Sequence, residues 1–155
     1  MRILVCSDSH GAARNLMLAV DQQPAADCYV FLGDGLAEAQ LLRHRGKPAY
    51  LLRGNCDGPA EKAPLYAQFE LAGQRIFAAH GHIEQVKWGL DALLYRAQEH
   101  GAQLCLFGHT HAPFCTYCDG VTLFNPGSLR DGLYGFADLT AAGVVCQHVR
   151  VREVL

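Results

Sequence analysis

Short apolar runs recur along the chain, and each of the early ones ends in a polar tip. These runs stop at about residues 7, 32, 53, 79 and 107, and Gly, Asp, Asn or His follows each of them. Runs of about four to eight apolar residues bounded by turn residues are typical of buried strands. The pattern therefore predicts strands at 3–7, 28–32, 49–52, 75–79 and 104–107.

Other segments show helical or hairpin patterns. Apolar residues at helical spacing predict helices at 12–22, 36–44 and 90–100. Residues 68–71 and 75–79 flank Ala72-Gly73, which predicts a hairpin. The C-terminal third is β-rich, with a strong turn signal at Asp119-Gly120. Its predicted strands are 114–117, 121–124, 134–139 and 144–151.

This order of elements predicts an α/β fold. The early strands alternate with helices, which favours parallel pairing because parallel strands need long crossover connections. The β-rich end favours a second, partly antiparallel sheet. The chain of 155 residues shows no repeat, low-complexity tract or linker, so we expect a single domain over residues 1–155.

The polar tips carry seven side chains suited to binding divalent metals. Functional groups gather at the carboxyl ends of strands in open α/β sheets. Two carboxylates, one carboxamide and four imidazoles suit Mn²⁺, Fe²⁺, Co²⁺, Ni²⁺ or Zn²⁺, and the lack of thiolates argues against a structural zinc site. Seven ligands exceed the needs of one ion, so a bridging carboxylate would let two ions share them. The residues are Asp8, His10, Asp34, Asn55, His80, His109 and His111.

Each motif alone is also typical of a solvated turn, and only their ordered combination is informative. Together they resemble the calcineurin-like metallophosphoesterase superfamily, and in particular its compact bacterial and archaeal phosphodiesterase branch. That branch also resembles a retromer subunit that uses the fold as a binding scaffold. The resemblance rests on Asp8-Ser9-His10, Gly33-Asp34, Gly54-Asn55-Cys56-Asp57, His80, Gly108-His109-Thr110-His111 and Asn125-Pro126-Gly127-Ser128.

The resemblance implies both a fold and a reaction. The implied fold is two packed mixed β-sheets flanked by helices, a four-layer α/β/β/α sandwich. One ion would be held by Asp8, His10, Asp34 and His111. The other would be held by Asp34, Asn55, His80 and His109, with Asp34 bridging. We expect Mn²⁺, with Ni, Co, Fe or Zn also compatible. The implied enzyme is a metal-dependent phosphodiesterase that cleaves small phosphodiesters by attack of a metal-bridging hydroxide.

We expect catalytic roles for Asn55, Cys56, Asp57 and His82. Superfamily members often carry His where this chain has Cys56, with Asp57 as the orienting partner. A thiol with an ordinary pKa near ~8.5 is a poor substitute for imidazolium. His82 could replace the missing acid, or be a supporting or surface histidine. We therefore expect activity to favour esters with acidic leaving groups, such as aryl phosphodiesters.

Two arginines could steer phosphate, although most arginines are surface residues. Arg53 precedes the Asn55 tip, and Arg130 follows the loop at 125–128. The net charge is −2 and no basic-aromatic stripe is visible, so no extended nucleic acid is expected as a partner.

The remaining features set weaker expectations. No stretch approaches the ~20 apolar residues that span a membrane, and the N-terminus is no signal peptide, so we expect a cytoplasmic protein. The seven cysteines favour buried thiols, and Cys115 and Cys118 lack a second pair for a zinc site. Trp88, Tyr95 and Phe114 favour core positions, with a homodimer interface as the alternative. A metal-binding scaffold for protein–protein interaction is the alternative function.

Overall fold

The computed structural model describes residues 1–59 and 61–153, which form two mixed five-stranded sheets. In the first sheet, the neighbours β1, β2 and β3 are parallel, whereas β9 runs antiparallel to both β1 and β10. Its strands, in spatial order, are β10 (Gly143–Arg150), β9 (Leu133–Thr140), β1 (Arg2–Cys6), β2 (Cys28–Phe31) and β3 (Ala49–Leu51).

The second sheet has parallel pairs in its centre and an antiparallel hairpin at each edge. The hairpins turn at the two positions predicted from sequence, Ala72-Gly73 and Asp119-Gly120. Its strands, in spatial order, are β4 (Tyr66–Leu71), β5 (Gln74–Ala79), β6 (Leu104–Leu106), β8 (Val121–Asn125) and β7 (Phe114–Cys118).

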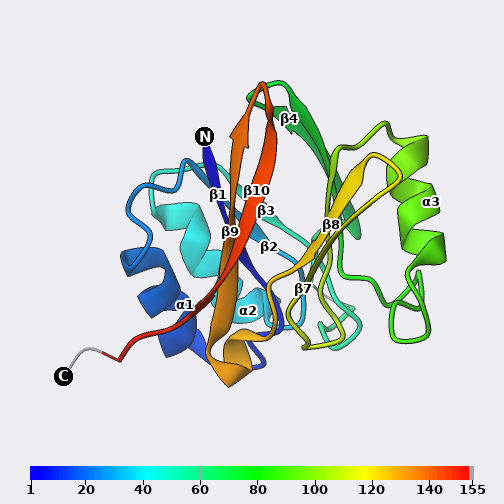
Figure 1. The fold of residues 1–155 in the computed structure, drawn as a ribbon. Helices are drawn as coiled ribbons and strands as arrows, with labels where there is room; N and C mark the ends of the chain where they lie inside the picture. Colours follow the sequence, from blue (N-terminus) through cyan, green and yellow to red (C-terminus); the bar gives the residue numbers. More distant parts are fainter. Residues whose placement is uncertain (60, 154–155) are drawn as a thin grey trace.

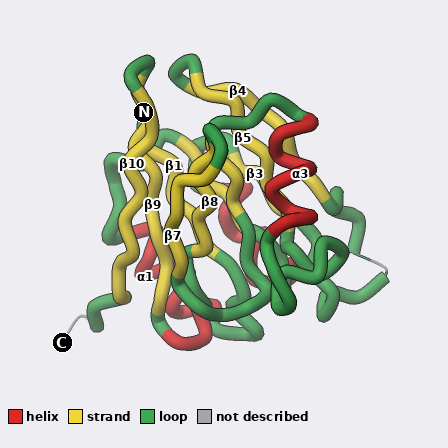
Figure 2. The backbone as a smooth tube through the Cα atoms, turned by 45° about the vertical axis from the view of Figure 1, so that its right-hand side comes forward, coloured by secondary structure: helices red, strands yellow, loops and turns green. Residues whose placement is uncertain are grey.

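Helices cover the outer faces of the two sheets. Helices α1 (Ala13–Asp21) and α2 (Leu36–Ala39) lie beside the first sheet, and α3 (Asp91–Glu99) lies beside the second (Figures 1 and 2). Short 3₁₀ helices follow at Gln40–His44 and Leu129–Asp131. The arrangement confirms the expected four-layer α/β/β/α architecture.

The alternation of side chains along the strands explains the layering. In β1, Ile3 and Val5 pack in the core between the sheets, whereas Leu4 and Cys6 pack against α1 and α2. Successive residues of a strand point to opposite faces, so a continuously apolar strand can serve two cores. A third core joins α3 to the second sheet around Phe77.

Three expectations need correction. The C-terminal strands do not build one sheet of their own, because β7 and β8 join one sheet and β9 and β10 the other. The predicted helix at 36–44 is one α-helical turn followed by a 3₁₀ helix. Trp88, Tyr95 and Phe114 are exposed, at 89%, 64% and 39%, because they lie in a loop, on the outer face of α3 and on an edge strand, and are not core residues.

None of the helices within the described ranges is long and apolar enough to cross a membrane. All seven cysteines are free thiols. Burial raises the pKa of the Cys115 thiol on β7 and raises that of Cys146 on β10 to about 12.

Candidate functional site

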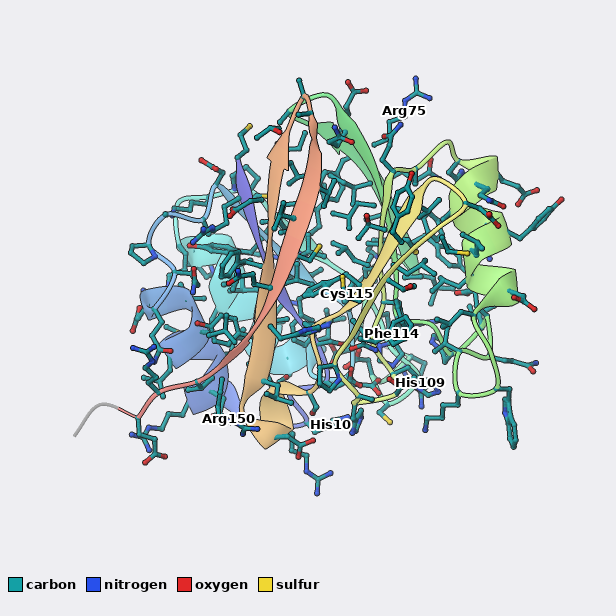
Figure 3. All side chains as sticks on the ribbon, in the orientation of Figure 1. His10, Arg75, His109, Phe114, Cys115 and Arg150 are labelled. Atoms are coloured by element: carbon teal, nitrogen blue, oxygen red, sulfur yellow. The ribbon has the colours of Figure 1, made fainter. Side chains whose placement is uncertain are left out.

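The polar tips that follow five strands come together at one end of the sandwich. They follow β1, β2, β3, β5 and β6, at the carboxyl ends of these strands. His10 follows β1 of the first sheet and His109 follows β6 of the second, and both lie at the end of the molecule opposite Arg75 (Figure 3). The structure brings all seven predicted ligand residues into this region.

The first group of ligand atoms consists of Asp8, His10 and His111. The Oδ1 atom of Asp8 lies 3.2 Å from Nε2 of His111 and 3.6 Å from Nε2 of His10. The two histidine Nε2 atoms are 3.2 Å apart. Three donor atoms from loops about a hundred residues apart in sequence thus face one point.

The second group consists of Asp34, His80 and His109, with Asn55 beside them. The Nε2 atom of His80 lies 3.1 Å from Oδ2 of Asp34 and 3.1 Å from Oδ1 of Asn55. The His109 ring lies 5.1 Å from the His80 ring, measured between centroids.

Asp34 lies between the two groups. Its Oδ2 atom is 3.1 Å from Nε2 of His80 in the second group and 3.8 Å from Nε2 of His10 in the first. Its other oxygen, Oδ1, accepts a hydrogen bond of 2.8 Å from the backbone N–H of Cys56. That bond fixes the carboxylate with Oδ2 facing both groups.

The distances between the donor atoms match those expected for ligands of a shared metal ion. Two ligand atoms that are each about 2.1 Å from a shared ion lie about 3.0 to 3.4 Å apart for angles between 90° and the tetrahedral value. Several of the separations fall in this range. Oδ1 of Asp8 is buried and has no hydrogen-bond partner among the described residues, which is costly for a carboxylate without a cation.

One histidine also has the orientation that a ligand needs. Nδ1 of His80 lies 2.8 Å from the backbone oxygen of Leu32. A proton on Nδ1 that is donated to this carbonyl leaves the Nε2 lone pair directed at the site.

The backbone of the tips is strained at the ligands. Five of them have φ between 43° and 71°, in the left-handed region that non-glycine residues rarely adopt. Such strained conformations persist only where contacts from the surrounding structure hold the backbone in place. The five residues are Asp8, His10, Asp34, His109 and His111.

Two glycines let the tips pack directly against each other. A Cβ atom on Gly54 would lie 2.7 Å from the backbone nitrogen of Asp34 and would also collide with its carboxylate. A Cβ atom on Gly108 would lie 2.8 Å from Oδ2 of Asp8. Both positions therefore require glycine for close approach of the tips.

Asp57 fastens two tips through their backbones. Its Oδ1 atom accepts hydrogen bonds from the N–H groups of Gly35 and Leu36, at 3.0 and 2.9 Å. Its Oδ2 atom accepts bonds from those of Asp34 and Gly54, at 2.9 and 2.8 Å. The structure thus gives Asp57 a clear role in positioning Asp34, and the catalytic role expected from sequence stays a prediction.

Side chains at the end of β8 and in the loop after it, together with Ser7, hold the tips around the first ligand group in place. Residue types alone did not predict these contacts. The hydroxyl of Ser128 donates to the backbone oxygen of Asp8 at 2.8 Å. Nδ2 of Asn125 donates to the backbone oxygen of Gly108 at 3.1 Å, and the hydroxyl of Ser7 donates to Asp8 Oδ2. All three side chains are buried. The Asn125–Ser128 motif carried the only sequence signal for this support.

Comparison with known proteins identifies the family. A family model described as the calcineurin-like phosphoesterase superfamily domain matches residues 1–145. The chain belongs to this superfamily.

Two relatives and one solved structure show what the chain is similar to. The probable metallophosphoesterase YsnB of Bacillus subtilis is 33% identical over 133 residues, covering 84% of this chain and 76% of YsnB. The phosphodiesterase YfcE of Escherichia coli is 29% identical over 175 aligned positions, covering 94% and 91% of the two chains. The structure of vacuolar protein sorting 29 from Cryptosporidium parvum matches with a TM-score of 0.76 at 18% identity, covering 98% and 92%, which shows a shared fold. The chain is a metal-dependent phosphoester hydrolase.

The electrostatics of this metallophosphoesterase favour cation binding. Burial opposes ionisation of Asp34, but the hydrogen bond and charge of His80 outweigh it and lower the Asp34 pKa to about 2. Burial and the charge of His80 lower the pKa of His109 to about 4. At neutral pH Asp34 is therefore a carboxylate and His109 a neutral imidazole, the forms that bind divalent ions.

Neither of the two expected proton donors is placed in an environment that favours proton donation. Burial, and after it the carboxylate of Asp34, raise the pKa of the Cys56 thiol. Burial, and after it the charge of His80, lower the pKa of His82, which disfavours the protonated ring that could act as an acid. Arg130 is exposed, and its backbone N–H donates to the Asp8 oxygen at 3.2 Å.

Proposed function

We propose that this metallophosphoesterase is a two-metal phosphodiesterase that acts on small phosphodiesters. The observation that carries the proposal is the position of Asp34 Oδ2, which faces donor atoms of both ligand groups. Asp8, His10 and His111 would complete one ion site with Asp34. Asn55, His80 and His109 would complete the other. Mn²⁺, the metal expected from the sequence, is the first to test. Other divalent ions should be tested after it, because nitrogen and oxygen ligands of this kind accept several of them.

Held by these residues, two divalent ions would supply an activated water at neutral pH and would polarise the phosphoryl oxygens. The chain supplies the charge balance and the positioning. Asp8 and Asp34 contribute −2 against the +4 of two ions, and the neutral imidazoles add nothing. With both ions bound the site would keep a net positive charge, which would attract an anionic phosphodiester, and the exposed Asn55 would be accessible to it.

The group at position 56 sets the leaving-group preference that we propose. Cys56 is exposed beside Asn55, and Nδ2 of Asn55 lies 3.4 Å from its sulfur. A thiol protonates a departing alkoxide poorly, so leaving groups that need no proton should depart faster. Aryl diesters should therefore be cleaved faster than alkyl diesters when chemistry limits the rate. Equal rates for the two under that condition would refute the proposed preference.

Hydrolysis of bis(p-nitrophenyl) phosphate tests the function itself. The purified protein, stripped of metal and reloaded with Mn²⁺, should release nitrophenolate and contain two ions per chain by elemental analysis. Asp34→Asn should abolish turnover. Stoichiometric metal binding without turnover in any divalent metal would favour the second candidate, a binding scaffold, for which the fold shared with vacuolar protein sorting 29 is the supporting observation.

A further inference from the structure

A cavity of about 350 Å³ lies directly beside the candidate metal centre. It adjoins the second ligand group through Asn55, whose Oδ1 atom is 3.1 Å from Nε2 of His80. A cavity of this size is at the lower end of the range for small-molecule sites, about 300 to 1,000 Å³. Its lining residues are Arg53, Gly54, Asn55, Asp57, Pro59 and His82.

Arg53 places an uncompensated positive charge at this cavity. Its backbone N–H donates to the Pro64 oxygen at 3.0 Å, which fixes the main chain, and its side chain is half-buried. Across residues 1–59 and 61–153, the guanidinium makes no ion pair or hydrogen bond. A half-buried guanidinium that lines a cavity is suited to bind a planar or tetrahedral anion.

The carboxylate in the lining does not neutralise Arg53. Both oxygens of Asp57 face backbone N–H groups of the neighbouring tips, and they accept four hydrogen bonds there. Its charge is thus largely compensated by these donors.

His82 joins the cavity to the metal centre. Its ring centroid lies 5.4 Å from that of His80 and 6.2 Å from that of His109. Nδ1 of His82 is buried and has no hydrogen-bond partner within the described part of the chain. Among the described residues, the cavity therefore offers a guanidinium and a ring nitrogen that both lack a partner, next to the candidate metal centre.

We propose that this cavity is a subsite for a second anionic group of the substrate, bound by Arg53 and His82. The proposal rests on the proposed phosphodiesterase function and narrows it to diesters in which one ester arm carries a further phosphate. A second phosphate held there would anchor the substrate without taking part in bond cleavage, so it acts on KM and not on kcat.

A matched pair of substrates tests the subsite. Both are p-nitrophenyl esters of thymidine 5′-phosphate, one with a free 3′-hydroxyl and one with a 3′-phosphate. With Mn²⁺ loaded, the 3′-phosphate should lower KM at least tenfold and leave kcat nearly unchanged. Arg53→Gln should remove this difference. Arg43→Gln, which deletes the same charge at the 3₁₀ helix after α2, should keep it.

A binding measurement separates the subsite from catalysis. In calorimetric titrations of the Mn²⁺-loaded protein, thymidine 3′,5′-bisphosphate should bind at least tenfold more tightly than thymidine 5′-phosphate. Arg53→Gln should lose that preference, and Arg43→Gln should retain it. Unchanged urea unfolding of Arg53→Gln establishes that the variant is folded.

The outcomes are distinguishable. Absence of diester hydrolysis in every metal defeats the proposed function, while the binding preference still decides the subsite. Hydrolysis without any effect of the 3′-phosphate overturns the subsite alone. A loss of kcat on both substrates in Arg53→Gln, with the KM ratio preserved, would assign Arg53 to the scissile phosphate and also overturn it.

Discussion

Replacing Asp57 by asparagine tests whether its carboxylate holds the tips of the metal centre in place. The substitution keeps the size and shape of the side chain. It changes one oxygen, which accepts two backbone hydrogen bonds, into an amide nitrogen, which accepts none. The variant should therefore be less stable and should also bind metal more weakly.

The structure sets the size of the effect. Oδ1 accepts from Gly35 and Leu36, and Oδ2 accepts from Asp34 and Gly54, so either orientation of the amide loses two bonds. Hydrogen bonds to charged groups contribute about 1.5 to 3 kcal/mol each, which gives about 3 to 6 kcal/mol for two. Because Asp57 is only half-buried, water can replace part of this loss, and we expect about 3 kcal/mol.

Urea unfolding of the metal-free protein measures this loss. With a slope of about 2 kcal/mol per molar urea, the midpoint should fall by about 1.5 M. Asp21→Asn is the matched control, because Asp21 is exposed and forms only a surface ion pair with Arg45 at 3.4 Å. That control should cost less than about 1 kcal/mol. Equal midpoints for the two variants would refute the role of Asp57.

Three further predictions concern the centre and the loop beside it. Asp34→Asn should lose both ions, and His111→Ala mainly one; elemental analysis decides, and wild-type metal content in Asp34→Asn would exclude bridging. Gly108→Ala should lose the ion held by Asp8, because the new Cβ would lie 2.8 Å from Oδ2 of that residue; wild-type metal content would contradict this. Burial raises the pKa of Glu84, and its Oε2 atom has no hydrogen-bond partner among the described residues. Because the pKa of Glu84 is raised in the folded state, its carboxyl group favours folding when it is protonated, below the unfolded pKa of about 4.3. This contribution is lost as the pH rises through the folded-state pKa, and the buried carboxylate then costs stability. Glu84→Gln should therefore stabilise the metal-free protein by about 1 to 3 kcal/mol at pH 8 and change little at pH 4; an equal effect at both pH values in urea unfolding would disprove the charge argument.

The sequence predicted the strands and the convergence of the tips because both are local signals. Apolar runs that end in Gly33-Asp34 or Gly108-His109 mark a strand and the turn after it. Parallel pairing aligns the carboxyl ends of β1, β2 and β3 in one sheet and of β5 and β6 in the other. The ligand side chains gather because the two sheets pack on each other with these ends together. Strand order could not be predicted, because partners distant in the sequence decide which sheet β7 and β9 each join.

Supporting residues escaped prediction for a different reason. Asp57 and Ser128 act on backbone N–H and C=O groups, which every residue carries, so the partner leaves no trace in the sequence. The sequence motif thus identified Asp57 as a residue of the site, but it did not predict that Asp57 joins two tips. Trp88 shows the opposite error. A large apolar side chain favours a core position, but the fold of the chain leaves this one exposed in a loop.

The strain at the ligands and the hydrogen bonds around them are two parts of one arrangement. Backbone in a sparsely populated region costs about 1 to 3 kcal/mol per residue, and five ligands adopt it here. That total is comparable to the whole stability of an ordinary domain, about 5 to 15 kcal/mol, so contacts outside the ligand set must offset it. Asp57 makes those contacts at two tips, and Asn125 and Ser128 each make them at one further tip. Mutations at such residues should weaken metal binding although none of them needs to touch an ion, which makes metal affinity a more sensitive measure of their role than activity.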